Sequence, residues 1–300
     1  MLPLMLAPRC NATQGRYRNI PQGFTLVELV TVIIILGILV LAVSNFLIFG
    51  TRIFIDSTSV EQVMGQSRFA MERMTRDIRN AVPNSIRIRS SIGNGINDYT
   101  NEWQCIEMMP IASSASYITA PIAPAAAAPT AMVMQASSGA PLTNAQSLLI
   151  YPLSPADVYT ATNGTSGKLF SINAVNAMPN NASLVVFNNT VQFNEASPRQ
   201  RYFGITSAVS YCFEKVTDEL SELKRYTNYA FNNLAQPSPV QMGNGVLMAE
   251  NVVNTIGLNS PMAYTPGTLQ NNAMVHLNPL FDIQGQVLQY HHQVQVINVP

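Results

Sequence analysis

Charged side chains are scarce in this chain of 300 residues, at 11 % of the total. The 16 basic and 16 acidic residues cancel to a formal net charge of zero at neutral pH. Proteins that mainly bind nucleic acid concentrate basic charge, so this composition argues against nucleic acid as a partner. The hydrophobic content of 47 % is sufficient for one large or two ordinary domains.

Catalytic and metal-binding motifs are also missing from the sequence. It has no Gly-x-Ser-x-Gly, Gly-x-x-x-x-Gly-Lys or His-Glu-x-x-His motif. His291 and His292 are adjacent in an expected strand, where their side chains would point to opposite faces and would not easily share a metal ion. Neither Cys105 nor Cys212 has the Cys-x-x-Cys spacing of a zinc or dithiol site. We therefore expect no enzymatic activity, no cofactor and no metal ion.

The chain does contain one long apolar run, Phe24–Phe49, whose 26 residues include a single formal charge, Glu28. At about 1.5 Å of rise per residue, a helix of this length crosses a hydrocarbon layer of about 30 Å. An acidic group inside a membrane costs roughly 2.5 kcal/mol or more. We therefore expect Glu28 to be functional and to require a partner.

The residues before the apolar run indicate its orientation. Arg9, Arg16 and Arg18 precede it and no acidic residue does. The positive-inside tendency then places the N-terminus in the cytoplasm and everything after Phe49 outside.

Two simpler interpretations of this run are an ordinary secretory signal, cut near 42–44, and a plain membrane anchor. The apolar stretch is longer than a typical signal core, and an acidic residue near its start has no purpose in a discarded peptide. A plain anchor leaves the Gly-Phe-x-x-x-Glu spacing to chance.

Residues 20–29, Ile-Pro-Gln-Gly-Phe-Thr-Leu-Val-Glu-Leu, resemble the class III signal of type IV prepilins and type II secretion pseudopilins. The resemblance implies that a membrane aspartyl peptidase cuts between Gly23 and Phe24 on the cytoplasmic side and methylates the new amine of Phe24. Removal of residues 1–23 leaves 13 basic and 16 acidic residues. Many major pilins carry a helix-kinking proline further along this helix, whereas here 43–46 read Val-Ser-Asn-Phe.

The same resemblance gives Glu28 a partner. The Phe24 amine of the cut chain would be a cation one helical turn from Glu28, on the same face. In a filament, Glu28 of one subunit would pair with the Phe24 amine of the next, which relieves two buried charges together.

The partners implied by the resemblance are a prepilin peptidase and methyltransferase, other major and minor pilins, an inner-membrane assembly platform and inner-membrane lipid. It also implies a single-pass protein of the inner membrane of a Gram-negative-type bacterium. Its C-terminal domain would be periplasmic, and the subunit would reach a pilus or the cell surface after assembly.

The expected fold class is α+β, of the type IV pilin-like kind, with a long N-terminal helix packed on an antiparallel β domain. An apolar stripe at spacings of three, four and seven continues to Val82, where Pro83 disfavours helix at the preceding residue. We expect a cleaved leader at 1–23, a membrane and filament-core helix at 24–49, its amphipathic continuation at 50–83 and a periplasmic or extracellular β-rich domain at 84–300. The helix would span 24–82.

Short apolar pieces separated by Asn, Gly, Pro and Ser predict the strands of the β domain. The expected strands are 85–89, 104–109, 147–151, 168–172, 183–187, 208–214, 221–226, 274–277 and 286–297. We expect a hairpin connection at 215–220, a short helix in preference to a strand at 245–254, and an exposed low-complexity loop near 120–131. Removal of Cys10 with the leader leaves Cys105 and Cys212, which either form a disulfide or stay as buried free thiols.

The length of the mature chain, 277 residues, indicates a minor subunit rather than a compact major pilin. Segment 67–87 resembles the amphipathic stretch of PilW-like and J-type minor pseudopilins. Segments 264–271 and 292–300 resemble the related MshO-type minor pilins of mannose-sensitive haemagglutinin (MSHA) pili. The resemblance implies a subunit that initiates, primes or caps a pilus and so supports surface attachment. The alternatives are the tip of a type II secretion pseudopilus and a pilus-mounted adhesin in which Trp103 contacts glycans.

Overall fold

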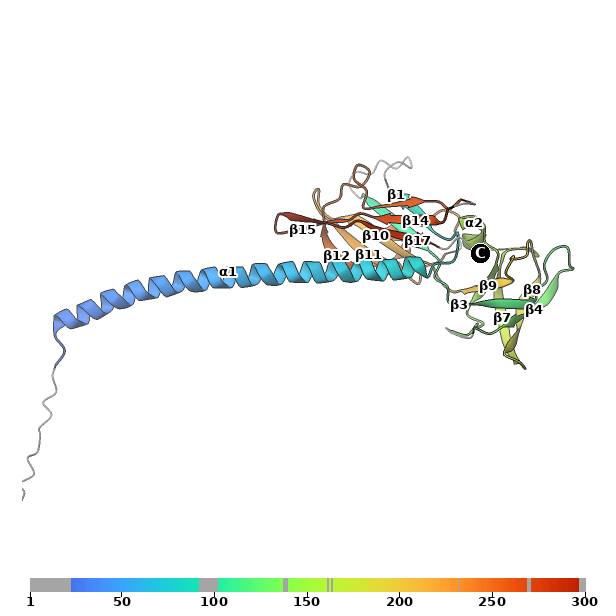
Figure 1. Ribbon diagram of the computed structural model, residues 1–300, viewed down its shortest axis with the longest axis horizontal. Helices are drawn as coiled ribbons and strands as arrows, with labels where there is room; N and C mark the ends of the chain where they lie inside the picture. The colour runs from blue at the N-terminus through green and yellow to red at the C-terminus, as the bar shows by residue number, and fades with distance from the viewer. Residues whose placement is uncertain are drawn as a thin grey trace, which may run out of the picture. The chain divides into compact units, whose positions relative to one another are not determined.

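The computed structural model describes residues 23–91, 102–136, 140–160, 162, 164–231, 233–268 and 271–296. The chain divides into two compact units, Met1–Ile55 and Asp56–Pro300. It has the predicted α+β fold, with one long N-terminal helix followed by an antiparallel β domain (Figure 1). Residues 1–22, which include most of the expected leader, lie outside the described residues.

Helix α1 spans Leu26–Arg79, 54 residues. Up to Ile55 it belongs to the first unit, and its side chains there are exposed. From Asp56 it belongs to the second unit, where Ser67, Ala70, Met71, Met74 and Ile78 form its buried stripe. The helix ends three residues before the predicted Val82, because the Val82 amide donates to the Met109 carbonyl and Ala81 bridges to Pro110.

The first sheet of the second unit has seven strands in the order β1-β2-β10-β11-β12-β15-β16, all antiparallel. A separate three-stranded sheet has the order β13-β14-β17. The strands of the first sheet are Arg87–Ser90 (β1), Trp103–Met108 (β2), Val209–Lys215 (β10), Ser221–Thr227 (β11), Val246–Val252 (β12), Leu280–Ile283 (β15) and Gln286–Gln289 (β16). Those of the small sheet are Met262–Thr265 (β13), Ala273–Leu277 (β14) and His292–Val296 (β17).

A second seven-stranded sheet has the order β4-β3-β9-β5-β7-β8-β6. Its strands all come from the chain between β2 and β10, which are neighbours in the first sheet. They are Ser113–Thr119 (β3), Ala128–Met134 (β4), Ser147–Ile150 (β5), Ser166–Gly167 (β6), Leu169–Met178 (β7), Ala182–Phe193 (β8) and Arg201–Ile205 (β9). Residues 113–205 therefore form an excursion from the first sheet that returns beside its starting point.

The second unit contains four groups of buried side chains in its described part, the smallest of which surrounds Cys105 and Cys212. One lies between α1, the first sheet and the three-stranded sheet, and includes Met74, Ile78, Tyr211 and Phe281. A second fills the excursion. A third lies between the excursion and the rest of the second unit, and contains Val82, Tyr159 and Phe203. Tyr159 lies in the short helix α2, Pro155–Tyr159; the other short helix, α3, spans Pro239–Met242.

Three expectations for the β domain were wrong. Residues 245–254 form strand β12 instead of a helix. The expected strand 286–297 is two strands, because β16 pairs with β15 whereas β17 pairs with β14 in another sheet. The low-complexity segment is not entirely a loop: Ile122 bridges to Phe193, and residues 128–131 lie in β4, paired with β8. The hairpin connection between β10 and β11 is confirmed, with Lys215 opposite Ser221.

Candidate functional site

The N-terminus of α1 contains the candidate processing and assembly residues. Gly23, Phe24 and Thr25 precede the helix, which begins at Leu26. The Glu28 amide lies 3.3 Å from the Thr25 hydroxyl and 3.1 Å from the Thr25 carbonyl, and the Leu29 amide donates to the same carbonyl. Thr25 therefore acts as the N-cap, since its oxygens satisfy amides that have no partner within the helix.

Thr25 was missed in the sequence analysis, although Thr-Leu-Val-Glu has the spacing of a capping box. This arrangement also changes the expected relation between Phe24 and Glu28. Phe24 lies before the cap, so the two residues are not on consecutive turns of one helix face as anticipated. Glu28 lies in the first turn, where a carboxylate interacts favourably with the positive end of the helix dipole.

The apolar side chains of α1 between Leu29 and Phe49 are exposed. Leu29 is 57 % exposed, Ile35 62 % and Phe46 75 %. This part of α1 is the single described helix that is long and apolar enough to cross a membrane, and none of its apolar window is buried. Exposed apolar surface of this extent requires lipid or other subunits to cover it.

Residues 18–44 match the family model described as the prokaryotic N-terminal methylation motif. The matched range contains Gly23, Phe24, Thr25 and Glu28 and runs into the exposed apolar part of α1. The chain therefore carries a type IV pilin-like signal at the start of a hydrophobic helix. The match does not reach the β domain, and the comparison with curated proteins finds no match to this chain.

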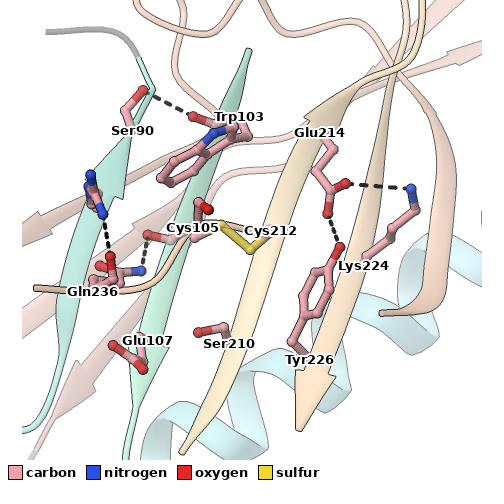
Figure 2. Close-up of a disulfide and its surroundings, with 12 residues drawn as sticks. Ser90, Trp103, Cys105, Glu107, Ser210, Cys212, Glu214, Lys224, Tyr226 and Gln236 are labelled. Carbon is pink, nitrogen blue, oxygen red and sulfur yellow. Dashed lines mark hydrogen bonds and ion pairs between the residues drawn. A yellow bond between two sulfur atoms is a disulfide. The ribbon is translucent and has the colours of Figure 1, made fainter. Parts of the chain in front are cut away.

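Cys105 and Cys212 form a disulfide between β2 and β10 (Figure 2). They are directly opposite each other in the antiparallel register, and their Cα atoms are 4.1 Å apart. Both are fully buried, next to Tyr226 and Met242. The bond joins the two strands between which the chain makes its excursion.

A buried ionic cluster lies two residues beyond Cys105 on β2. Glu107 is fully buried, forms an ion pair with Arg87 on β1 and accepts a hydrogen bond of 2.9 Å from Tyr229. Burial raises the pKa of Glu107, and the neighbouring Arg87 and Tyr229 only partly oppose this. The Arg87 guanidinium also lies 3.8 Å from the centre of the Tyr159 ring, so the cluster links the first sheet to α2 in the excursion.

Trp103 is half-buried and lines a hollow of about 560 Å³ with polar neighbours that include Glu102, Lys215 and Gln236. The Arg89 guanidinium lies 5.7 Å from the centre of its ring. The side-chain oxygen of Gln236 is buried without a hydrogen-bond partner among the described residues. An aromatic face beside polar side chains is a surface on which a polyol can be held.

The three histidines do not form a metal site with other residues in the described part of the chain, where no group of three or more His, Cys, Asp or Glu side chains gathers. His276 lies in β14 and contacts Thr265. His292 begins β17 and His291 precedes it, so strand alternation does not separate them, and both line one groove beside α1. This groove was not foreseen.

Proposed function

We propose that this chain is a minor subunit of a type IV pilus, of the MSHA type, which initiates, primes or caps filament assembly and so supports surface attachment. The observation that carries the proposal is the methylation motif at 18–44, placed at the start of a helix whose apolar side chains are exposed from Leu29 to Phe49. Filament assembly would cover these side chains with the helices of other subunits.

In this proposal residues 1–23 are the leader, 24–49 the membrane and filament-core helix, 50–83 its amphipathic continuation and 84–300 the exported domain. The N-terminus is cytoplasmic and the β domain periplasmic until assembly. The disulfide supports this topology, since disulfides persist in oxidising compartments. Glu28 of one subunit pairs with the methylated Phe24 amine of its neighbour.

Mass spectrometry of the mature protein tests the processing step. The expected mature N-terminus is Phe24 with one added methyl group. Substitution of Gly23 by Leu should leave the leader attached, while Gly37→Leu, within the apolar helix, should be processed normally. Recovery of wild-type protein with an intact leader, or with a start near residue 45, would refute the proposal.

A pseudopilus tip shares the same helix and the same processing. The genes beside this one separate the two systems: pilin and motor genes favour the pilus, whereas a secretin with exported enzymes favours the secretion system.

The hollow beside Trp103 favours a second candidate, a pilus-mounted adhesin that binds glycans. Binding of the purified chain to a glycan array, lost in Trp103→Ala but retained in Tyr264→Ala, would support it. As a control for folding, both variants must have the same midpoint of denaturant unfolding as the wild type. Absence of any glycan bound by the wild type would remove this candidate.

A further inference from the structure

A groove of about 760 Å³ runs along one flank of α1 in the second unit, between the helix and residues 290–292. It lies beside the buried stripe, not opposite it, because successive residues of a helix are rotated by about 100°. On the helix side, its lining comprises Arg68, Met71, Glu72, Thr75, Arg76 and Arg79 of α1, and Asn80, which follows the helix.

The groove is positively charged. Arg68, Arg76 and Arg79 are exposed and form no ion pair within the described residues, and Glu72 is the one acidic residue in its lining. His291 and His292 form part of the opposite wall. Three arginines against one carboxylate leave a formal excess of positive charge even with both histidines neutral.

The sequence around these arginines also contains Asp77, but the fold directs it to the other flank. The Asp77 carboxylate accepts a hydrogen bond of 2.8 Å from Tyr211 and lies 3.0 Å from Arg225 and 3.4 Å from Arg73. These partners neutralise it. The helix is therefore divided into a flank with paired charges and a flank with uncompensated cations.

The walls of the groove are fixed and partly apolar. The Tyr290 hydroxyl lies 3.0 Å from the Ser67 hydroxyl of the helix. The Tyr290 ring packs edge-on against the ring of buried Phe281, with the two ring centres 5.6 Å apart. His291 contacts Asn278 through its ring nitrogen at 3.0 Å. Met71 and Tyr290 supply apolar surface between the cations.

We propose that this groove binds an acidic segment of a neighbouring pilin-type subunit, whose carboxylates pair with Arg68, Arg76 and Arg79 and whose apolar side chains contact Met71 and Tyr290. The inference rests on the proposed function, since it requires a filament neighbour. Charged pairs of this kind set orientation and register more than they set affinity. The groove would thus select which subunit lies beside this one.

The geometry favours a protein segment over other anions. A flat bilayer surface contacts protruding basic side chains, whereas these arginines line a hollow. Nucleic-acid binding gains its affinity from many phosphate contacts, whereas this groove is lined by three arginines. Bidentate pairing with carboxylates suits the arginine side chain, and the apolar lining suits a peptide.

The first arm of the test uses the purified full-length chain in an uncharged detergent and a fluorescent peptide of alternating Glu and Leu. We expect saturable binding that weakens with salt, and about tenfold weaker binding for R76Q/R79Q. The matched control is R199Q/R201Q, which removes the same charge at the start of β9 and in the turn before it. Equal binding of a Gln–Leu peptide, equal loss in both variants, or stronger binding to phosphatidylglycerol vesicles would each contradict the proposal.

The second arm places a photo-reactive p-benzoylphenylalanine at Thr75, inside the groove, in cells that assemble the filament. The expected adduct joins Thr75 to an acidic peptide of a pilin-type subunit, and its yield falls in R76Q/R79Q but not in R199Q/R201Q. An adduct with lipid, glycan or a peptide without carboxylates would overturn the groove inference while correct processing at Phe24 left the proposed function intact. An unprocessed chain absent from filaments would instead overturn the proposed function.

Discussion

Two roles are consistent with the position and charge of Glu28, and a substitution that removes only the charge separates them. Its position three residues after Thr25 fits a capping box, and its charge fits pairing with a neighbouring amine. Glutamine retains the capping geometry but not the charge. If charge pairing governs assembly, Glu28→Gln should reduce incorporation into filaments as severely as Glu28→Ala, while leader removal continues in both. Counts of labelled subunits in purified filaments measure this.

Filaments with normal Glu28→Gln content and depleted Glu28→Ala content would assign the residue to capping alone. Thr25→Ala is the complementary variant, since it removes the cap and keeps the carboxylate. Loss of an N-cap destabilises a helix by about 1 kcal/mol, which a helix of this length tolerates. We therefore expect Thr25→Ala to assemble.

Glu107 makes stability depend on pH. Because burial raises its folded-state pKa above the ordinary value of 4.5, the folded chain holds a proton more tightly than the unfolded chain does. Between 4.5 and the raised pKa, the native state therefore binds more protons, and the free energy of unfolding falls as pH rises. Glu107→Gln removes this contribution.

Urea unfolding from about pH 4 to about pH 8 measures the difference between wild type and Glu107→Gln. The variant lacks the titrating carboxyl, so the difference should shift in favour of the variant as pH rises. A difference that does not vary with pH would show that Glu107 titrates alike in both states.

The second half of α1 is held by its buried stripe. Met74 is fully buried in the core between the helix and the first sheet, whereas Phe69 is 60 % exposed. Met74→Ala should lower the free energy of unfolding by roughly 2 to 5 kcal/mol, because it leaves a cavity. Phe69→Ala should cost less than about 0.5 kcal/mol. Fluorescence of Trp103 during urea unfolding of the full chain reports both, and similar costs would mean that the helix does not pack as described.

Individual elements show why prediction succeeded and failed. The long helix and the β10–β11 hairpin follow from local periodicity and a local turn, which the sequence displays directly. Strand β12 was mistaken for a helix because register shifts opposite Leu223 break the two-residue alternation, so buried Ala249 and Val252 are three residues apart. The expected strand 286–297 is divided at Tyr290 and His291, where the chain passes from the first sheet to the three-stranded sheet. No glycine or proline lies at this point to indicate the division in the sequence.

The candidate sites also differ in how far the sequence alone predicts them. Gly23, Phe24 and Glu28 lie within one short segment, 23–28, so their pattern can be read from the sequence. The groove depends on which flank of the helix each charge occupies and on residues more than two hundred positions away, such as Tyr290. In the sequence, Glu72 and Asp77 both lie among these arginines. Only the pairing of Asp77 with Tyr211 and Arg225 reveals the remaining positive charge.

At the scale of the whole molecule, the disulfide closes a loop with a sequence separation of 107 residues. Replacing both cysteines by Ala should destabilise the chain by roughly 2 to 5 kcal/mol, largely because the unfolded chain gains conformational freedom. The unfolding midpoint of C105A/C212A against wild type measures this. Cys212→Ala alone should lose as much stability, and an unchanged midpoint in either variant would show that the strands need no cross-link.

The position of this bond also bears on mechanical load. A pull transmitted from α1 through β1 and β2 passes at Cys105 directly to Cys212 on β10, which leads to the C-terminal strands. The excursion between the two cysteines is outside this covalent path, so tension along the chain cannot extract it while the bond is intact. Its sheet can therefore vary in length and surface without weakening the covalent path along which a pull would be transmitted.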